Sequence, residues 1–109
     1  MADEIVPIFR VKDGDAAAEW YGRMGFVVES THRFEPGFPL YVVLERQGLH
    51  LHLSEHKGDA HKKSLAYMWV DDVDPIADIY GLEVEEAPWA REITLVDPYG
   101  NQLRVGQAI

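Results

Sequence analysis

The sequence lacks cysteine, long apolar runs and an apolar leader. Without cysteine, disulfide bonds and thiol catalysis are excluded, and nothing argues for an oxidising compartment. No stretch approaches the roughly 20 apolar residues that a membrane-spanning helix needs. The first residues, Met-Ala-Asp-Glu-Ile, are acidic and therefore unlike a signal peptide. These absences predict a cytoplasmic protein with no membrane partner.

Positive charge is also scarce. The chain has 10 Lys and Arg residues against 19 Asp and Glu residues, which gives a formal net charge of −9. Nucleic acid is excluded as a partner, because no basic face remains to displace its counterions. The acidic surplus would attract a cationic ligand, although many proteins carry such a surplus simply for solubility.

The usual signatures of catalysis are missing. The sequence has no Ser in a strand–turn–helix elbow, no glycine-rich phosphate loop and no nucleophile paired with a base. Carboxylates are plentiful, but their spacing places no pair for acid–base chemistry. We therefore assign no catalytic residue and no cofactor, and we expect a binding protein rather than an enzyme.

An internal repeat divides the chain into two similar halves. Two segments agree at an offset of 59 positions: Val11-Lys12-Asp13-Gly14-Asp15 with Val70-Asp71-Asp72-Val73-Asp74, Ala18 with Ala77, and Tyr21-Gly22 with Tyr80-Gly81. An Asp just before a helical run is a good N-cap, because its carboxylate accepts hydrogen bonds from the amides of the first turn. The repeat predicts a duplicated strand–helix–strand unit.

Hydrophobic periodicity predicts the elements of each half. Alternating residues indicate strands, and a 3.6-residue apolar stripe indicates a helix. We predict strands at residues 5–11, 26–35, 40–45, 49–54, 64–70 and 83–86, helices at 15–24 and 74–80, and a closing hairpin over 88–106. The fold class is therefore α+β, a single domain 1–109 of two tandem βαβββ modules at about 1–57 and 58–109.

The closing hairpin carries the most distinctive local sequence. Its strands flank the turn Asp97-Pro98-Tyr99-Gly100-Asn101, in which Pro presets φ and Gly and Asn accept positive φ. Just before the hairpin, Pro88-Trp89 puts a large ring on a loop, where no packing period demands it. The turn is typical of a scaffold, whereas Trp89 indicates a site.

These motifs resemble the glyoxalase/bleomycin-resistance/extradiol-dioxygenase (vicinal oxygen chelate) superfamily over essentially the whole chain. Three strings are most similar to its bleomycin-resistance members: Val6-Pro7-Ile8, Ala66-Tyr67-Met68-Trp69-Val70 and Pro88-Trp89-Ala90-Arg91-Glu92. The resemblance implies curved, open mixed sheets around a cleft. The second helix and the strand after it are shorter than the usual pattern of the superfamily.

The metal site of the superfamily's enzymes is not expected here. The resemblance implies His or Glu ligands on strands one, four, five and eight. The matching positions hold Val6 or Pro7, Ser64 or Leu65, and Arg104, a fixed cation that would repel a metal. Only His50 or His52 on strand four remains. This His-x-His pair is either a metal-binding pair or the polar face of an amphipathic strand.

Aromatic side chains are the stronger candidates for ligand contact. Trp20 and Tyr21 are expected in the core, whereas Tyr67 and Trp69 share a strand face that is either core or cleft wall. By resemblance to the bleomycin-binding members, Trp89 and a ring near Phe38 would sandwich the drug's flat bithiazole. Phe34 and Tyr41 compete with Phe38 for that role. Trp89 could instead pack on its own hairpin or on a dimer partner.

The sequence thus predicts a non-catalytic protein that sequesters a cationic, planar antibiotic of the bleomycin class. The expected ligand-binding residues are Trp89, Phe38, Trp69, Tyr67, His50, His52 and Arg104. The alternative is a metal-dependent enzyme of the same superfamily with an altered metal site built on His50 and His52. The resemblance also implies a homodimer with shared clefts, with or without exchange of the first strand beyond Pro7.

Overall fold

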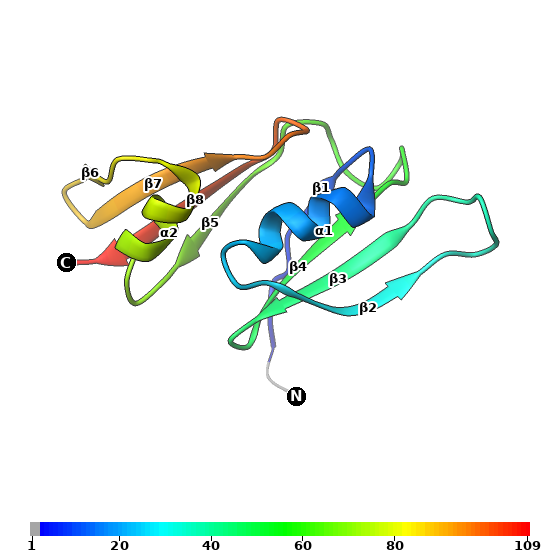
Figure 1. The fold of residues 1–109 in the computed structure, drawn as a ribbon, viewed down its shortest axis with the longest axis horizontal. Coiled ribbons are helices and arrows are strands. Elements are labelled where there is room, and N and C mark those ends of the chain that lie inside the picture. Colours follow the sequence, from blue (N-terminus) through cyan, green and yellow to red (C-terminus); the bar gives the residue numbers. More distant parts are fainter. Residues whose placement is uncertain (1–2) are drawn as a thin grey trace.

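A computed structural model describes residues 3–109, and its elements follow the predicted order (Figure 1). The strands and helices are β1 (Ile8–Arg10), α1 (Gly14–Gly22), β2 (Val27–His32), β3 (Tyr41–Arg46), β4 (Leu49–Ser54), β5 (Leu65–Trp69), α2 (Asp74–Tyr80), β6 (Glu85–Glu86), β7 (Ala90–Val96) and β8 (Gln102–Ala108). The βαβββ pattern occurs twice, which confirms the predicted α+β fold. No helix in the described part of the chain is long and apolar enough to cross a membrane.

The two halves build two sheets of identical topology. The strand orders are β1-β4-β3-β2 and β5-β8-β7-β6. In each sheet the first strand pairs parallel to the last, and the other pairs are antiparallel. β1 pairs with β4 of its own chain, with Ile8 opposite His52. We call the half with the first sheet module one and the other half module two.

The two helices lie on the same side of the molecule, each across one sheet (Figure 1). Asp13 caps α1 as predicted, since its carboxylate accepts a hydrogen bond from the Ala16 amide. α1 ends at Gly22, earlier than predicted, and the chain then turns at Gly25, where φ is 106°. The predicted Asp cap of α2 is wrong, because its N-cap is Val73, and Pro75 lies in the first turn of the helix.

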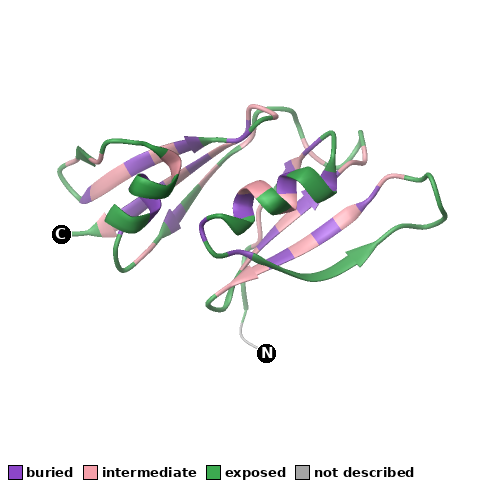
Figure 2. Ribbon diagram, in the orientation of Figure 1, coloured by how far each residue is buried: buried purple, intermediate pink, exposed green. Residues whose placement is uncertain are grey.

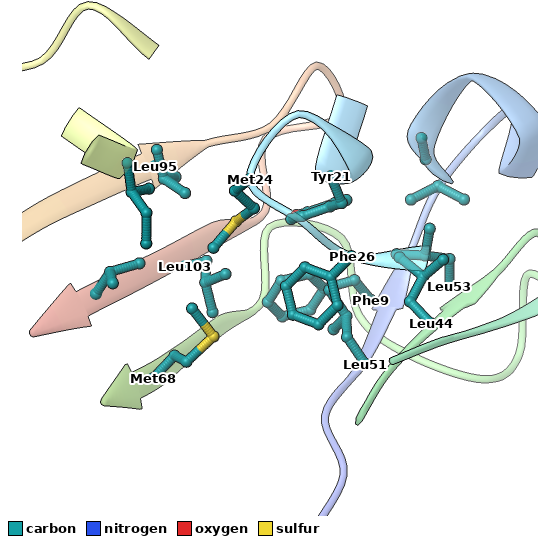
Figure 3. Packing of buried hydrophobic residues seen from close by; sticks show 14 of the residues in the cluster. Phe9, Tyr21, Met24, Phe26, Leu44, Leu51, Leu53, Met68, Leu95 and Leu103 are labelled. Carbon is teal, nitrogen blue, oxygen red and sulfur yellow. The ribbon is translucent and has the colours of Figure 1, made fainter. Parts of the chain in front are cut away.

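One apolar core joins the two modules. In Figure 3, Phe9, Tyr21 and Leu51 of module one continue into Met68 and Leu103 of module two. Tyr21 is fully buried, as predicted for a core residue, and Trp20 is half-buried and packs against the edge of the same core.

Two hydrogen bonds, one buried and one partly buried, reinforce this junction between the modules. The Tyr21 hydroxyl donates to Asp97 over 2.7 Å, and the Asn101 side-chain amide donates to the Arg10 carbonyl over 2.8 Å. Burial, together with the charge of Asp97, strongly raises the pKa of Tyr21. This tyrosine therefore stays a neutral donor, and the turn before β8 is fixed to α1 and β1 of the other module.

Each sheet has a helix-covered face and an open face. In β4, Leu51 and Leu53 are buried under α1 while His50 and His52 alternate with them on the opposite side. In the same way, Leu103 of β8 is buried and Arg104 lies on the open side. β2 is exposed along its whole length (Figure 2).

Candidate functional site

The open face of module two carries three exposed aromatic side chains: Tyr67 and Trp69 of β5 and Trp89 from the β6–β7 turn. We call them the aromatic cluster. They are 39, 53 and 59% exposed, respectively. The rings of Tyr67 and Trp69 lie 4.9 Å apart between centroids. Of the two alternatives for Tyr67 and Trp69, the structure excludes the core, so both side chains are available to a ligand.

Glu92 of β7 ties this cluster together. Its Oε2 atom accepts hydrogen bonds from the Tyr67 hydroxyl at 2.6 Å and from the Trp89 indole N–H at 2.8 Å. The Tyr67 ring reaches Glu92 by crossing Gly106, which faces Glu92 in the strand register. A Cβ atom at Gly106 would lie only 2.0 Å from the tyrosine oxygen, so the ring occupies the space that a side chain would need.

The hydrogen bonds keep Glu92 charged. Donation by Tyr67 and then by Trp89 lowers the pKa of Glu92. Desolvation and then the bond to Glu92 raise the pKa of Tyr67, which stays protonated and donating. The Oε1 atom of Glu92 accepts no hydrogen bond from residues 3–109. The cluster thus combines exposed π faces with a fixed negative charge, a combination that suits a planar cation.

Sequence reasoning missed Glu92. The alternation of Glu92 and Thr94 with the buried Ile93 and Leu95 does place Glu92 on the open face. Its partners, however, come from β5 and from the turn before β7, and one strand's pattern does not reveal which side chains of another strand reach it. The one local signal is the spacing Trp89-x-x-Glu92.

A pocket of about 250 Å³ lies where the two sheets meet. Tyr67 and Trp69 line it from module two, and His50 and Leu49 line it from β4. The segment before β1 closes another side with Glu4, Ile5 and Pro7. The structure therefore brings three of the predicted residues, His50, Tyr67 and Trp69, around one pocket.

His50 is held by two carboxylates. Its Nδ1 atom lies 3.0 Å from Glu4, whose other oxygen accepts a hydrogen bond from the His50 amide, and its Nε2 atom lies 3.3 Å from Glu29 of β2. The hydrogen bonds to Glu4 and then to Glu29 raise the pKa of His50. His50 thus fastens the segment before β1 to the sheet through Glu4.

His52 lies two residues away on the same face, but its surroundings shift its pKa in the opposite direction. Its Nδ1 atom pairs with the Tyr41 hydroxyl at 2.7 Å, and the two rings meet edge to face. Burial, and then the neighbouring His50, lower the pKa of His52. Tyr41 is thereby engaged on module one, in the middle of the sheet.

The His-x-His pair does not gather a set of metal ligands. Glu4 and Glu29 contact opposite nitrogens of the His50 ring, so they cannot converge with that ring on one ion. Nowhere in residues 3–109 do three His, Cys, Asp or Glu side chains cluster as a metal site requires. The donor set therefore does not fit the metal of the superfamily's enzymes.

Four of the predicted site residues are not among those that line the pocket: His52, Trp89, Arg104 and Phe38. Arg104 of β8 faces the open side beside the aromatic cluster: it lies between Tyr67 and Thr94 in the strand register, and its charge acts on both Tyr67 and Glu92. Phe38 lies in the β2–β3 loop beside Phe34, with ring centroids 5.9 Å apart. That loop lies at one end of the long axis and the β6–β7 turn with Trp89 at the other (Figure 1). Phe38 and Trp89 of one chain therefore do not face each other.

A comparison with known protein families identifies the superfamily of this chain. A family model described as a glyoxalase superfamily protein matches residues 1–109. The chain belongs to the glyoxalase superfamily. No curated protein sequence matches this superfamily member at a significant level.

Solved structures of the same fold include several antibiotic-binding proteins. A bleomycin-binding protein complexed with bleomycin is 25% identical, with a TM-score of 0.75 over 99% of this chain and 100% of that one. The bleomycin-binding protein from bleomycin-producing Streptomyces verticillus, complexed with copper(II)-bleomycin, is 22% identical over all of both chains, with a TM-score of 0.72. TnmS3, an antibiotic-binding protein from Streptomyces sp. CB03234, is 21% identical over 100% of this chain and 99% of that one, with a TM-score of 0.70.

Proposed function

We propose that this protein binds a cationic, partly planar antibiotic of the bleomycin class and confers resistance by sequestering it, without chemical conversion. The observation that carries the proposal is the aromatic cluster of Tyr67, Trp69 and Trp89 around the charged Glu92. Stacking on exposed rings and attraction to a carboxylate are sufficient for binding and require no catalyst. The similarity to a structure of a bleomycin complex supports this choice of ligand.

The net charge of −9 supports the same ligand class. Acidic surface attracts a cation over long range and raises its local concentration. We place this capture in the cytoplasm, a compartment that the cysteine-free sequence suits.

We further propose that the site is completed in a C2 homodimer. The two aromatic walls expected around the drug, Phe38 and Trp89, lie in loops at opposite ends of one chain (Figure 1). A two-fold axis would bring the β2–β3 loop of one protomer to the β6–β7 turn of its partner, and it would form two equal sites. Sedimentation at micromolar concentration is expected to show a dimer. A monomer there would contradict the shared site.

The deciding experiment is a titration with bleomycin followed by tryptophan fluorescence. Trp89 is 59% exposed, so Trp89→Ala is expected to leave the melting temperature unchanged. Bleomycin affinity should fall about tenfold or more, since a stacked ring contributes roughly 0.5–1.5 kcal/mol beyond its buried area. Trp89→Phe should retain part of the affinity.

Trp20 provides the matched control. It packs against Tyr80 on the helix-covered side, away from the aromatic cluster. Trp20→Phe should therefore bind bleomycin as the wild type does. Unchanged affinity in Trp89→Ala, or a melting temperature far below wild type in that variant, would contradict the assigned site.

A further inference from the structure

A second pocket, of about 540 Å³, lies at the other end of β1 from the first one. It forms where the end of β1, the β4–β5 loop and the β7–β8 turn come together, at the upper edge of Figure 1. Its volume is within the range of roughly 300–1,000 Å³ that is usual for small-molecule sites. The lining residues are Arg10, Val11, Lys12, Glu55, Lys57, Lys62 and Tyr99.

The charge of this pocket is opposite to that of the whole protein. Four of the chain's 10 Lys and Arg residues line it, in a molecule whose net charge is −9. Like charges brought together repel each other, and the repulsion lowers the stability of the folded state. Such a concentration of cations in an acidic chain therefore indicates a counter-charge that the pocket receives from outside.

The four cations are not used by the fold. Within residues 3–109, none of the four forms an ion pair or a side-chain hydrogen bond. Other arginines are engaged: Arg23 and Arg46 donate to backbone carbonyls, and Arg91 pairs with Asp74. The cations of the second pocket thus keep their donor groups available.

The one carboxylate that lines the pocket is committed to the backbone. Glu55 accepts hydrogen bonds from the Gly14 amide at 2.7 Å through Oε2 and from the Leu40 amide at 2.9 Å through Oε1. Both oxygens therefore hold the start of α1 and the start of β3 rather than a lysine. Glu55 offsets one of the four positive charges, so the residues that line the pocket keep a net positive charge.

We propose that this second pocket binds a small multiply charged phosphate anion of the pyrophosphate class, at a site separate from the antibiotic site. Half-buried Arg10, fixed by the pairing of β1 with β4, offers a planar fork that matches two phosphate oxygens. Lys12, Lys57 and Lys62 add point charges around it. Several cations favour a di- or polyphosphate over a single-charge anion, because each added negative charge gains another partner.

Isothermal titration with inorganic pyrophosphate tests this site directly. Wild-type protein is expected to bind it, and the affinity should fall as salt is added, because salt screens exposed charges. The double variant Arg10→Gln, Lys12→Gln should bind at least about tenfold more weakly. Absence of pyrophosphate binding at low salt would overturn the proposal, and so would equal affinity for sulfate and pyrophosphate.

Variants of two neighbouring lysines distinguish a specific binding site from a general effect of positive charge. Lys62 lines the pocket, whereas the stem of Lys63 packs beside Gly100 outside the lining. Lys62→Gln should weaken pyrophosphate binding several-fold, and Lys63→Gln, with the same loss of charge, should leave it unchanged. Equal losses in both variants would overturn the proposal. Bleomycin affinity should be unchanged in all of them, so the antibiotic site and the phosphate site can fail independently.

Discussion

The two modules have the same strand order, but the open faces of their sheets carry different kinds of side chain. On module one, β4 presents His50 and His52, whose partners are carboxylates and a tyrosine hydroxyl. On module two, the aromatic cluster surrounds Glu92. The first face is a network of titratable groups, and the second is a set of rings around a fixed charge.

This difference shows how a duplicated fold acquires a site. Pairing and helix packing decide which face of each sheet stays open, and they do so identically in both modules. The side chains on that face are then free to differ, because they do not support the core. Module two carries the exposed aromatic rings, whereas module one carries two histidines whose pKa values are shifted in opposite directions.

Gly106 gives the sharpest way to break the aromatic face, with the largest expected effect. A methyl group there would lie 2.0 Å from the Tyr67 oxygen, so Gly106→Ala must expel the ring and separate it from Glu92. We expect bleomycin affinity to fall about tenfold, as for the loss of a stacked wall. Fluorescence titration measures the affinity, and spectrophotometric titration should show the pKa of Tyr67 falling toward its ordinary value.

Two comparisons control this result. A Cβ atom at Gly58 would meet no atom within 4 Å, so Gly58→Ala should bind as the wild type does. In a Tyr67→Ala background, adding Gly106→Ala should change nothing more, because the two substitutions act through the same ring. Additive losses in the double variant would show that Gly106 acts by another route.

The helix starts of the two modules differ by a smaller amount. Asp13 caps α1 through the Ala16 amide, and Asp13→Ala should lower the free energy of unfolding by about 1 kcal/mol, within the usual range of roughly 0.5–2 kcal/mol. The corresponding Asp72 accepts a hydrogen bond from the Asp74 amide and none other from residues 3–109, and α2 has Pro75 in its first turn. Asp72→Ala should cost less in denaturant unfolding. Equal losses would mean that both modules rely on the same cap.

The two histidines of module one should give pH effects of opposite sign. The hydrogen bonds to Glu4 and Glu29 raise the pKa of His50 in the folded state. The contribution of His50 to stability is therefore fully present below about pH 6.5, the pKa of a histidine in the unfolded chain. It is lost as the pH rises through the higher pKa of His50 in the folded state. The stability advantage of wild type over His50→Gln should thus shrink as pH rises above about 6.5.

For His52 the sign is reversed. Burial lowers its folded pKa, so its contribution is present above about pH 6.5 and is lost as pH falls through the folded value. Wild type should lose stability relative to His52→Gln on acidification. Denaturant unfolding across pH measures both slopes, and slopes of the same sign would refute the different environments assigned to the two rings.

The last prediction is that removal of metal ions has no effect. Because the open face of module one gathers no set of metal ligands in residues 3–109, we expect a chelator to change neither the melting temperature nor bleomycin binding. A large drop in melting temperature with EDTA would instead favour the metal-dependent enzyme.

Local pattern predicted the elements well, because each strand and helix carries its own period. The alternation of Leu49, Leu51 and Leu53 with the histidines predicted β4 at its observed bounds, and α2 was likewise placed correctly. Periodicity also established that Tyr67 and Trp69 share a face. It did not reveal that this face is open, since that depends on which side the helices cover.

The periodicity of the sequence could not predict how far apart in space two remote segments of the chain lie. The contact of Tyr67 and Trp89 through Glu92 depends on three separate segments and on the space left by Gly106. The separation of Phe38 from Trp89 likewise follows from the sheet order, which puts β2 and β6 at outer edges. The aromatic content of the site was therefore predictable, but its construction was not.

The two hydrogen bonds at the module junction couple the folding of the two halves of the chain. Tyr21 and Asp97 are 76 positions apart, and Asn101 and Arg10 are 91 apart, so these contacts close nearly the whole chain into a loop. The entropy of that closure must be overcome before the junction gains any stability, a feature that slows folding. A separated half would lose the hydrogen bond between Tyr21 and Asp97 and would expose the apolar core that the two modules share. The two repeats should therefore fold and unfold together, as one cooperative unit.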